Sequence, residues 1–433
     1  MQPIDRFSHS QHTGRLYCFM IIIKLYRAIF YLSDRKNCCI ASKKLFPLYN
    51  EPRQTTFMRF LFVVQGEGRG HFMQAIEMHS MLKRHGHEVV ACLVGKSPQR
   101  KIPQYLYTHL SDVEILSFKS PNFVAHPGDK RPSVFLSVIY NVIKLPEFSL
   151  TARFLRHTVS RYKPDAVINF YDIMMGIANI FHPMQVPIIC IGHQYLFLHK
   201  QFDFPDKLKV ELDSLLVFTR ATSIGASKRL ALSFYPAPDD VKHDIVVVPP
   251  LLRQVVHNTT SQKGKYIHGY MLNSGFAEEV QQWHKRHPDV EMHFFWDKTD
   301  VPETYEYEPG LTFHYINDEK FLQYMAGCGG YATTAGFESV CEAIYLQKPV
   351  LMVPVHIEQA CNGYDAMKVG AGVVSKTFDM DKLLDLMQNY TPNPDFASWC
   401  DQAEERIIEA IEECVRNHRN RWYHRFFARH LFR

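Results

Sequence analysis

The sequence contains no C-x-x-C pair, and none of its ten cysteines stands beside histidines at the spacing of a zinc site. This absence excludes the common zinc-finger and zinc-ribbon classes. Several of the cysteines fall inside apolar runs, where cysteine behaves as a small hydrophobic residue. We therefore expect reduced thiols and a cytoplasmic protein.

The sequence also lacks an uninterrupted apolar run long enough to span a membrane. The run at 17–32 is broken by Lys24 and Arg27, and it has no small-residue cleavage pattern of a secretory signal. A short apolar run follows Met58 directly, so we interpret residues 1–57 as an extension outside the fold, with translation starting at Met58. The alternative is a basic, aromatic anchor on a membrane surface.

The central part of the chain also lacks an excess of positive charge, although the formal net charge of the whole chain is +5. Residues 1–57 carry nine basic and three acidic side chains, and residues 416–433 carry six arginines and no acid. The 34 basic and 41 acidic residues between these ends make the body acidic. Since tracking a nucleic acid needs a basic surface, we exclude nucleic acid as a partner.

From Met58 onward, buried strands, loops and helices alternate, and this pattern is typical of α/β proteins with parallel sheets. The first run has predicted strands at 60–64, 88–93, 113–117, 166–169, 187–191 and 245–250, and the second at 265–272, 291–296, 312–315, 330–333 and 350–353. Predicted helices include 72–84, 277–284, 321–326, 337–346 and 359–368.

A break between the two runs sets the predicted domains. Pro249 and Pro250 continue neither element, and a polar stretch follows them. We predict two Rossmann-like, doubly wound domains that face each other across a cleft, where the carboxyl ends of the strands bind ligands. The predicted units are an extension (1–57), an N-terminal Rossmann-like domain (58–250), a C-terminal Rossmann-like domain (251–390), and a helix with a basic aromatic tail (391–433).

A glycine-rich segment follows the first predicted strand. Gly66, Gly68 and Gly70 let the backbone approach a ligand, and His71 stands where the next helix opens. The imidazole of His71 is a candidate general base. The spacing is not that of a dinucleotide fingerprint, so NAD or FAD is not expected. The alternative is a tight turn with a surface histidine.

A second motif lies in the other predicted domain. A strand ends at Thr333 and a helix begins at Gly336, so that the helix amides and the hydroxyls of Thr334 and Ser339 form a place for a diphosphate. Glu342 lies on the same helical side as Ser339. A carboxylate there can accept two hydrogen bonds from a ribose diol.

On these motifs the chain resembles glycosyltransferases of the GT-B fold. The most similar groups are the UDP-glycosyltransferases and the bacterial enzyme that adds N-acetylglucosamine to the lipid-linked cell-wall precursor. The resemblance implies that Gly336, Ser339 and Glu342 bind the phosphate and ribose of the donor. It also implies that Glu358 and Gln359 contact the donor sugar.

The resemblance extends to the acceptor side. A glycine-rich loop that ends in a histidine matches the segment from Gly66 to His71, and His193 is similar to a histidine at the acceptor side of the cell-wall enzyme. The chain also departs from the family pattern. Plant enzymes have a histidine where Thr334 stands, and a neutral residue close to the donor phosphate where Glu338 stands.

Three further acids have two interpretations each. Asp172 follows the strand at 166–169 and either orients His71 or caps the next helix. Asp379 and Asp381 have the Asp-x-Asp spacing of metal-dependent glycosyltransferases, but they stand at the start of a late helix, and we interpret them as capping acids. We expect no metal and no cofactor, because the nucleotide sugar is a co-substrate.

The carboxyl-terminal tail has two open interpretations. Residues 416–433 interleave six arginines with five aromatic residues, as in segments that lie on an anionic membrane surface. A peripheral position on the inner face of the membrane would favour a lipid-linked acceptor. Alternatively, the preceding helix, at 396–415, packs on the first domain and the tail is solvated.

Together these features predict a metal-independent glycosyltransferase that moves a sugar from a nucleotide sugar, UDP-linked by resemblance, to a hydroxyl of a saccharide or glycolipid. One alternative is a nucleotide-sugar epimerase or hydrolase on the same fold, which would turn over donor without an acceptor. The other is a non-catalytic nucleotide-sugar-binding protein, whose function would survive the loss of His71.

Overall fold

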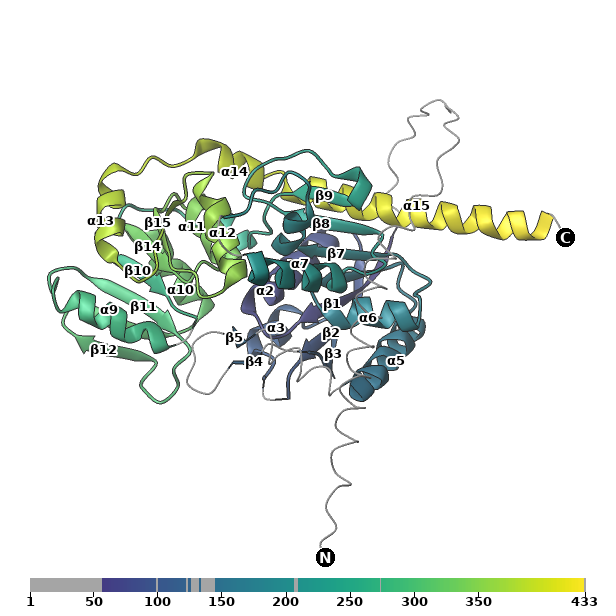
Figure 1. Cartoon of the computed structure of the whole chain (residues 1–433), viewed down its shortest axis with the longest axis horizontal. Helices are drawn as coiled ribbons and strands as arrows, with labels where there is room; N and C mark the ends of the chain where they lie inside the picture. The colour runs from purple at the N-terminus through teal and green to yellow at the C-terminus, as the bar shows by residue number, and fades with distance from the viewer. Residues whose placement is uncertain are drawn as a thin grey trace, which may run out of the picture.

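The computed structural model describes most of the chain after Met58. The described residues are 57–98, 100–121, 124–125, 132–133, 145–205, 209–272 and 274–431. The expectations for residues 1–56 lie outside this range. Two α/β lobes lie side by side, with the N-terminal lobe at the right and the C-terminal lobe at the left (Figure 1).

The N-terminal lobe is built on a seven-stranded parallel sheet in the order β3-β2-β1-β6-β7-β8-β9. Its strands are β1 (Arg59–Gln65), β2 (Glu88–Lys96), β3 (Glu114–Lys119), β6 (Ala166–Phe170), β7 (Ile188–Gly192), β8 (Lys228–Leu232) and β9 (Ile245–Val248), and β4 (Val124–Ala125) pairs with β5 (Pro132–Ser133) outside it. The strand order reverses between β1 and β6, which is where open α/β sheets bind ligands.

The C-terminal lobe has a second seven-stranded sheet in the order β12-β13-β11-β10-β14-β15-β16. Its strands are β10 (Ile267–Tyr270), β11 (Met292–Trp296), β12 (Thr304–Glu308), β13 (Leu311–Tyr315), β14 (Gly330–Thr333), β15 (Val350–Met352) and β16 (Gly372–Val374). Only the edge strand β12 pairs antiparallel, and the order reverses between β10 and β14. The predicted α/β class with two doubly wound sheets is confirmed.

Helices cover both sheets. Those of the N-terminal lobe and the linker are α2 (Arg69–Arg84), α3 (Gln104–His109), α5 (Leu145–Tyr162), α6 (Ile173–Phe181), α7 (Lys209–Thr222) and α8 (Gln254–His257), with short 3-10 turns η2 (His193–Leu198) and η3 (Val241–His243). Those that follow are η4 (Ser274–Phe276), α9 (Ala277–His284), α10 (Asp318–Gly327), α11 (Phe337–Tyr345), α12 (Ile357–Met367), α13 (Met380–Asn389), α14 (Pro394–Cys400) and α15 (Ala403–Leu431).

The central strands are apolar because helices bury them on both faces. Every residue of β6 and β7 is buried, and so are the five inner residues of β1. Several boundaries differ from the predictions by a few residues, and one of them bears on the site. Helix α2 begins at Arg69, three residues before the predicted start, so Gly70 and His71 lie in its first turn.

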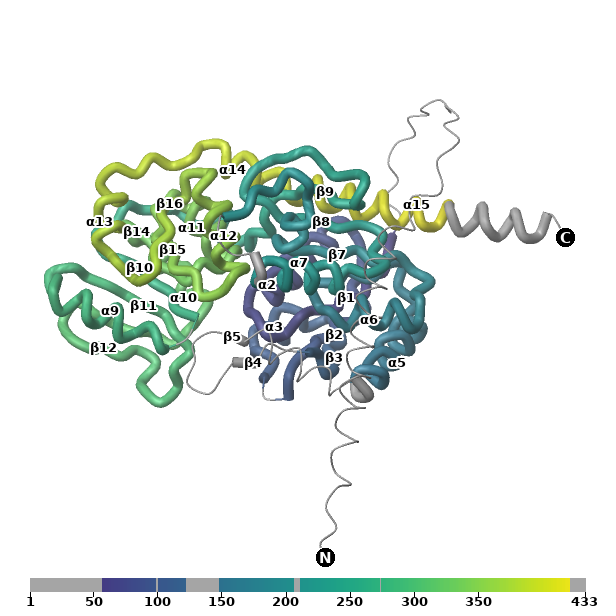
Figure 2. The backbone as a smooth tube through the Cα atoms, in the orientation of Figure 1, coloured from purple at the N-terminus to yellow at the C-terminus, as the bar shows by residue number. Residues whose placement is uncertain are grey.

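After the second sheet the chain returns to the N-terminal lobe, where α15 runs past β8 and β9 (Figure 2). Arg406 donates to the Val247 carbonyl at 2.7 Å, and Glu404 pairs with Arg84 at 2.7 Å. Packing on the first lobe, one of the two interpretations of this helix, is therefore observed. The side chains beyond residue 420 lie outside the described part. No described helix is both long enough and apolar enough to cross a membrane.

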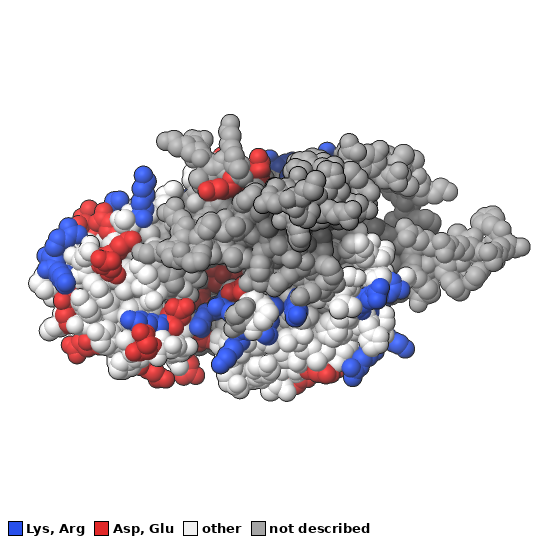
Figure 3. Space-filling view, turned by 60° about the horizontal axis from the view of Figure 1, so that its bottom comes forward, with Lys and Arg blue, Asp and Glu red and all other residues white. Residues whose placement is uncertain are grey.

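Figure 3 shows the charged side chains of the described residues on one face of the molecule. Acidic and basic side chains lie interspersed over the C-terminal lobe, at the left of that view. The seven described cysteines are all free and buried, as expected for reduced thiols. Burial raises the pKa of Cys190 to about 11, so the reactive thiolate form is disfavoured at neutral pH.

A group of histidines lies inside the C-terminal lobe. His268 on β10 is fully buried and stacks on Tyr331 at 5.1 Å, while His293 and His314 approach each other at 3.2 Å between ring nitrogens. Burial, and then the charges of His293 and His314, hold the pKa of His268 well below its usual range. Burial lowers the pKa of His314 to about 4.

These lowered pKa values predict a loss of stability in acid. In the unfolded chain these histidines have a pKa of about 6.5, so below this pH they bind protons there while they stay neutral in the folded lobe. The free energy of unfolding therefore falls as the pH drops from about 6.5 toward 4. Replacing His268→Phe should recover up to about 2 kcal/mol at pH 5. Urea unfolding at pH 7.5 and pH 5 measures this. The exposed His157→Gln control should behave as wild type, and an equal acid loss in His268→Phe would contradict the prediction.

Candidate functional site

The two sequence motifs meet where the lobes face each other. Helix α2 starts at the carboxyl end of β1, and helix α11 starts at the carboxyl end of β14. A Cβ atom on Gly70 would lie 2.6 Å from the carboxyl carbon of Glu338, closer than real side chains approach. The first turns of these two helices are therefore in contact between the lobes, and a side chain at position 70 would require the Glu338 carboxylate to move.

The three glycines of the loop have different roles. The Gly66 amide donates to the Gly95 carbonyl at 2.7 Å, and a Cβ on Gly66 would lie 2.9 Å from that oxygen. Gly66 therefore serves the packing of β1 against β2. Gly68 is the residue before α2, and a Cβ there would meet nothing closer than 3.9 Å. Gly70 alone serves the approach between the lobes.

His71 lies at this junction and is only 7% exposed. Its ring stacks on Tyr171 with centroids 5.6 Å apart, and its Nδ1 lies 3.3 Å from Gln74 Oε1. The other end of Gln74 donates to Glu338 Oε1 at 2.5 Å, across the cleft. Gln74 and Tyr171 were not predicted, although Gln74 follows His71 by three residues, the spacing that places two side chains on one helical face.

Asp172 does not contact His71 in the described part of the chain. Its Oδ1 accepts the Met174 amide at 2.8 Å, which is the helix cap given as the alternative. The reason is geometric, because the carboxylate lies against Gly95 while the preceding residue, Tyr171, presents its ring to His71. Burial raises the pKa of Asp172 to about 7, and the hydrogen bond from Met174 opposes the rise.

The turn into α11 is strained. Ala335 has a φ of +60°, in the left-handed region, and its carbonyl accepts a hydrogen bond from Asn362. The next residue, Gly336, is the extended N-cap of α11, and the Ser339 hydroxyl donates to its carbonyl at 3.3 Å. Thr334, which precedes Ala335 in this turn, is buried. The amino end of α11 thus has no capping side chain, and it faces α2 of the other lobe.

Glu342 is already paired in this structure. Arg253 donates to both of its oxygens, at 2.6 Å from Nε and 2.9 Å from Nη2. The two side chains are only 13% and 8% exposed, so the pair is buried. Arg253 belongs to the linker after β9 and was not predicted, since nothing in the sequence places the linker beside α11.

Glu358 and Gln359 make hydrogen bonds to different parts of the molecule. Gln194 donates to Glu358 Oε1 at 2.8 Å, which is another hydrogen bond between the lobes. Gln359 is buried and accepts the Val355 amide at 2.9 Å, within its own lobe. Consecutive residues on a helix point about 100° apart, so only Glu358 of the two faces the other lobe.

His193 joins the same contact between the lobes. Its ring stacks on Phe337, the first residue of α11, with centroids 4.1 Å apart. Its Nδ1 donates to the Leu232 carbonyl at 2.7 Å, and burial lowers the pKa of the imidazole. His193 is therefore a neutral ring that packs against the first residue of α11.

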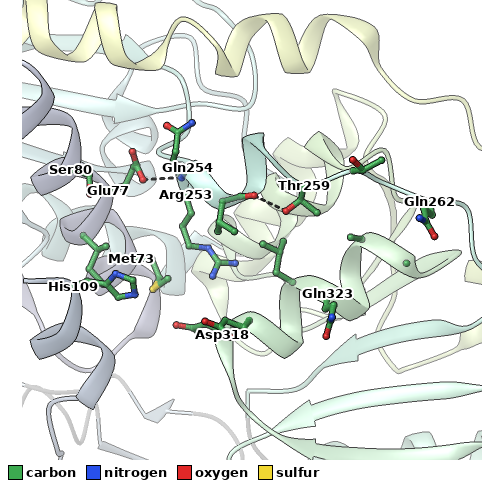
Figure 4. A pocket seen from close by; sticks show the side chains of 17 residues that line it. Met73, Glu77, Ser80, His109, Arg253, Gln254, Thr259, Gln262, Asp318 and Gln323 are labelled. Atoms are coloured by element: carbon green, nitrogen blue, oxygen red, sulfur yellow. Dashed lines mark hydrogen bonds between the residues drawn. The ribbon is translucent and has the colours of Figure 1, made fainter.

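A cavity of about 700 Å³ lies beside the buried ion pair, between α2, α10 and the linker. It is lined by Met73, Ile76, Glu77, Ser80, His109, Arg253, Gln254, Val255, Thr259, Thr260, Gln262, Asp318, Glu319, Leu322, Gln323, Ala326 and Gly327. Figure 4 shows Arg253 entering it from the linker, with Met73 and Asp318 on opposite lobes. Its size is that of an ordinary ligand pocket.

The Asp-x-Asp pair lies far along the chain, at the start of α13. Asp379 is the N-cap residue of that helix without a side-chain hydrogen bond to it, and Asp381 lies in the first turn. Among the described residues, no group of three or more histidine, cysteine or acidic side chains is placed to hold a metal ion.

The sequence of residues 58–390 matches the family described as glycosyl transferase family 1. The chain belongs to this family. It is a glycosyltransferase, and both facing lobes fall inside the matched residues. No curated protein sequence matches the chain.

Solved glycosyltransferase structures share the whole architecture. The calicheamicin glycosyltransferase CalG4 has a TM-score of 0.56 at 14% identity, over 83% of this chain and 98% of that one. UGT89C1 from Arabidopsis thaliana, complexed with UDP, has a TM-score of 0.54 at 15% identity, over 84% of this chain and 100% of that one. The same enzyme complexed with quercetin covers 83% and 99% of the two chains. The expected GT-B fold is therefore confirmed.

Proposed function

We propose that this glycosyltransferase moves a sugar from a UDP-sugar to an acceptor hydroxyl, with the nucleotide on the C-terminal lobe. One observation carries the proposal: His71, a residue able to take a proton, lies across the cleft from the uncapped amino end of α11. UDP as the nucleotide is supported by the UDP complexes of UGT89C1 and LpCGTa, which share the fold.

The donor would be held by the elements around α11. The amides of its first turn, with the hydroxyls of Thr334 and Ser339, suit a diphosphate. Glu342 suits the ribose diol, and Arg253, which donates to both of its oxygens in the free protein, would have to release it when the ribose binds. Glu358 faces the acceptor lobe and is the better placed acid for the donor sugar.

In the proposed reaction, His71 removes the proton from the acceptor hydroxyl as its oxygen forms a bond to the anomeric carbon. The bond from that carbon to the diphosphate oxygen breaks, and its electron pair stays on the diphosphate. The amides at the start of α11 stabilise this developing charge. Asp172 takes no part in the transfer, because its carboxylate caps α6. No cofactor takes part.

For the acceptor we propose a saccharide or a glycolipid hydroxyl. The arginine-rich, aromatic composition of residues 416–433 supports a glycolipid at the inner face of the membrane, with the protein bound peripherally. Helix α15 carries this segment away from the cleft along the N-terminal lobe, which is the acceptor side of the proposed site.

Thermal unfolding with nucleotides tests the donor site. At about one hundred times its Kd, UDP should raise the free energy of unfolding by about 2.7 kcal/mol and raise Tm accordingly. Uridine, which lacks the diphosphate, should give a much smaller shift at the same concentration. A panel of UDP-sugars would then identify the donor. If UDP leaves Tm unchanged while the protein is folded, the donor site is wrong.

The same panel separates the alternatives. A donor that is consumed without any acceptor indicates an epimerase or hydrolase. A donor that binds and is never consumed, with any saccharide or lipid acceptor, indicates a binding protein. Transfer to an acceptor supports the proposed function.

A further inference from the structure

The side-chain amide of Gln74 bridges the two lobes in a defined direction. Its Nε2 donates to Glu338 Oε1 at 2.5 Å, and its Oε1 lies 3.3 Å from His71 Nδ1. A carboxylate only accepts hydrogen bonds, so Gln74 must present its amino group to Glu338 and its oxygen to His71.

This direction decides which nitrogen of His71 carries the proton. An amide oxygen only accepts, so the Nδ1 of His71 must donate to Gln74. A neutral imidazole has a single N–H, and its Nε2 is then left with a free electron pair. That is the tautomer in which Nε2 can take a proton from an acceptor hydroxyl.

We propose that Glu338 is a positioning residue for His71, acting across the cleft through Gln74. The inference rests on the proposed role of His71 as the base. The proposal gives a role to Glu338, the acid that stands where the family pattern has a neutral residue close to the donor phosphate. Because Glu338 belongs to the C-terminal lobe and Gln74 to the other, the base acquires its reactive tautomer only when the two lobes are in contact.

Two further observations support this arrangement. Gly70 has no side chain, and a Cβ there would meet all three atoms of the Glu338 carboxyl group within 3 Å, so the sequence keeps this place open. The charged or polar groups that face Glu338 are His71 and Gln74 on α2 and Glu358 on α12. Burial raises the pKa of Glu338, and a positive charge on His71 opposes the rise most strongly.

The test is the tautomer of His71 in the full chain without any ligand. Long-range ¹H–¹⁵N spectra of histidine-labelled protein distinguish the two N–H positions, and a His71→Gln spectrum identifies the His71 signals among those of the 23 histidines. The wild type should carry the proton on Nδ1. In Glu338→Gln, whose amide both donates and accepts, Gln74 can turn over, and the Nδ1–H population should fall to roughly half.

A second variant, in the N-terminal lobe, disturbs the same hydrogen bond between Gln74 and Glu338. In Gly70→Ala, the new methyl group displaces the Glu338 carboxylate, and the Nδ1–H population should fall as well. The matched control is Glu358→Gln, which removes a neighbouring negative charge that makes no hydrogen bond to Gln74; the tautomer of His71 should stay as in the wild type.

Two results would overturn the inference. One is a proton on Nε2 of His71 in the wild type, and the other is a wild-type spectrum in both Glu338→Gln and Gly70→Ala. The experiment uses no nucleotide, so its outcome is independent of the donor site. Failure of UDP to shift Tm, with the tautomer responding as expected, would reject the proposed donor and leave the positioning of His71 intact.

Discussion

Replacing His71→Ala is expected to lower kcat by about 10²- to 10⁴-fold and to leave the Kd for UDP unchanged within about twofold. The variant removes the group that takes the acceptor proton, while the elements proposed to hold the nucleotide belong to the other lobe. Transfer rates with the donor and acceptor found by screening measure the first quantity. Calorimetric titration with UDP measures the second.

The exposed His157→Ala, a histidine on α5, is the matched control and should retain wild-type kcat. A His71→Ala variant with undiminished transfer would show that the base lies elsewhere. Loss of UDP affinity along with kcat would show instead that His71 holds the donor, and it would move the diphosphate toward α2.

Glu342→Ala is expected to lower the free energy of unfolding by about 3–5 kcal/mol and to abolish the Tm shift with UDP. Both effects arise from the same carboxylate. Its loss leaves Arg253 buried and unpaired at 13% exposure, and it removes the group that suits the ribose diol. Urea unfolding and thermal shift measure the two effects.

A double variant separates these effects. Arg253→Met with Glu342→Leu replaces the buried pair by apolar side chains of similar length, so stability should return to near that of the wild type. The UDP shift should stay absent, because no carboxylate is present for the ribose. A UDP shift restored in the double variant would mean that the loss in Glu342→Ala came from unfolding alone, and that Glu342 does not bind the donor.

Most of the strands could be predicted because they are apolar runs between polar loops. The strands missed are those without that pattern. In β12 two glutamates alternate with threonine and tyrosine on an exposed edge, β16 has three residues, and β8 opens with Lys228 and Arg229. Edge strands and strand ends face solvent on one side, so their composition resembles that of loops.

The candidate site was predicted in its parts. A glycine-rich loop before a helix, and a second glycine turn followed by Ser339 and Glu342, are local patterns, and local patterns are legible in a sequence. The position of one motif relative to the other could not be predicted. Arg253 lies 89 residues before its partner Glu342, and Gln74 lies 264 residues before Glu338. Only the tertiary packing of the linker and of the two lobes brings these pairs together.

Asp172 shows that a residue can be placed correctly along the chain while the contact of its side chain is not predicted. The sequence correctly placed it at the carboxyl end of a strand in the sheet that carries His71, yet the side chain caps its own helix while Tyr171 reaches the histidine. Which of two adjacent side chains faces the cleft depends on the backbone at the turn, where Tyr171 has a φ of +62°. No periodicity in the sequence reports such a conformation.

The sequence by itself therefore determined the α/β class, the two doubly wound sheets, and the loops at which ligands meet them, because these follow from the spacing of apolar residues and glycines along the chain. The tertiary structure alone decided which side chains act together. Glu338 bonds to Gln74 of the other lobe, and Glu342 to Arg253 of the linker. Such contacts depend on the relative placement of two separately folded surfaces, a quantity that local spacing does not contain.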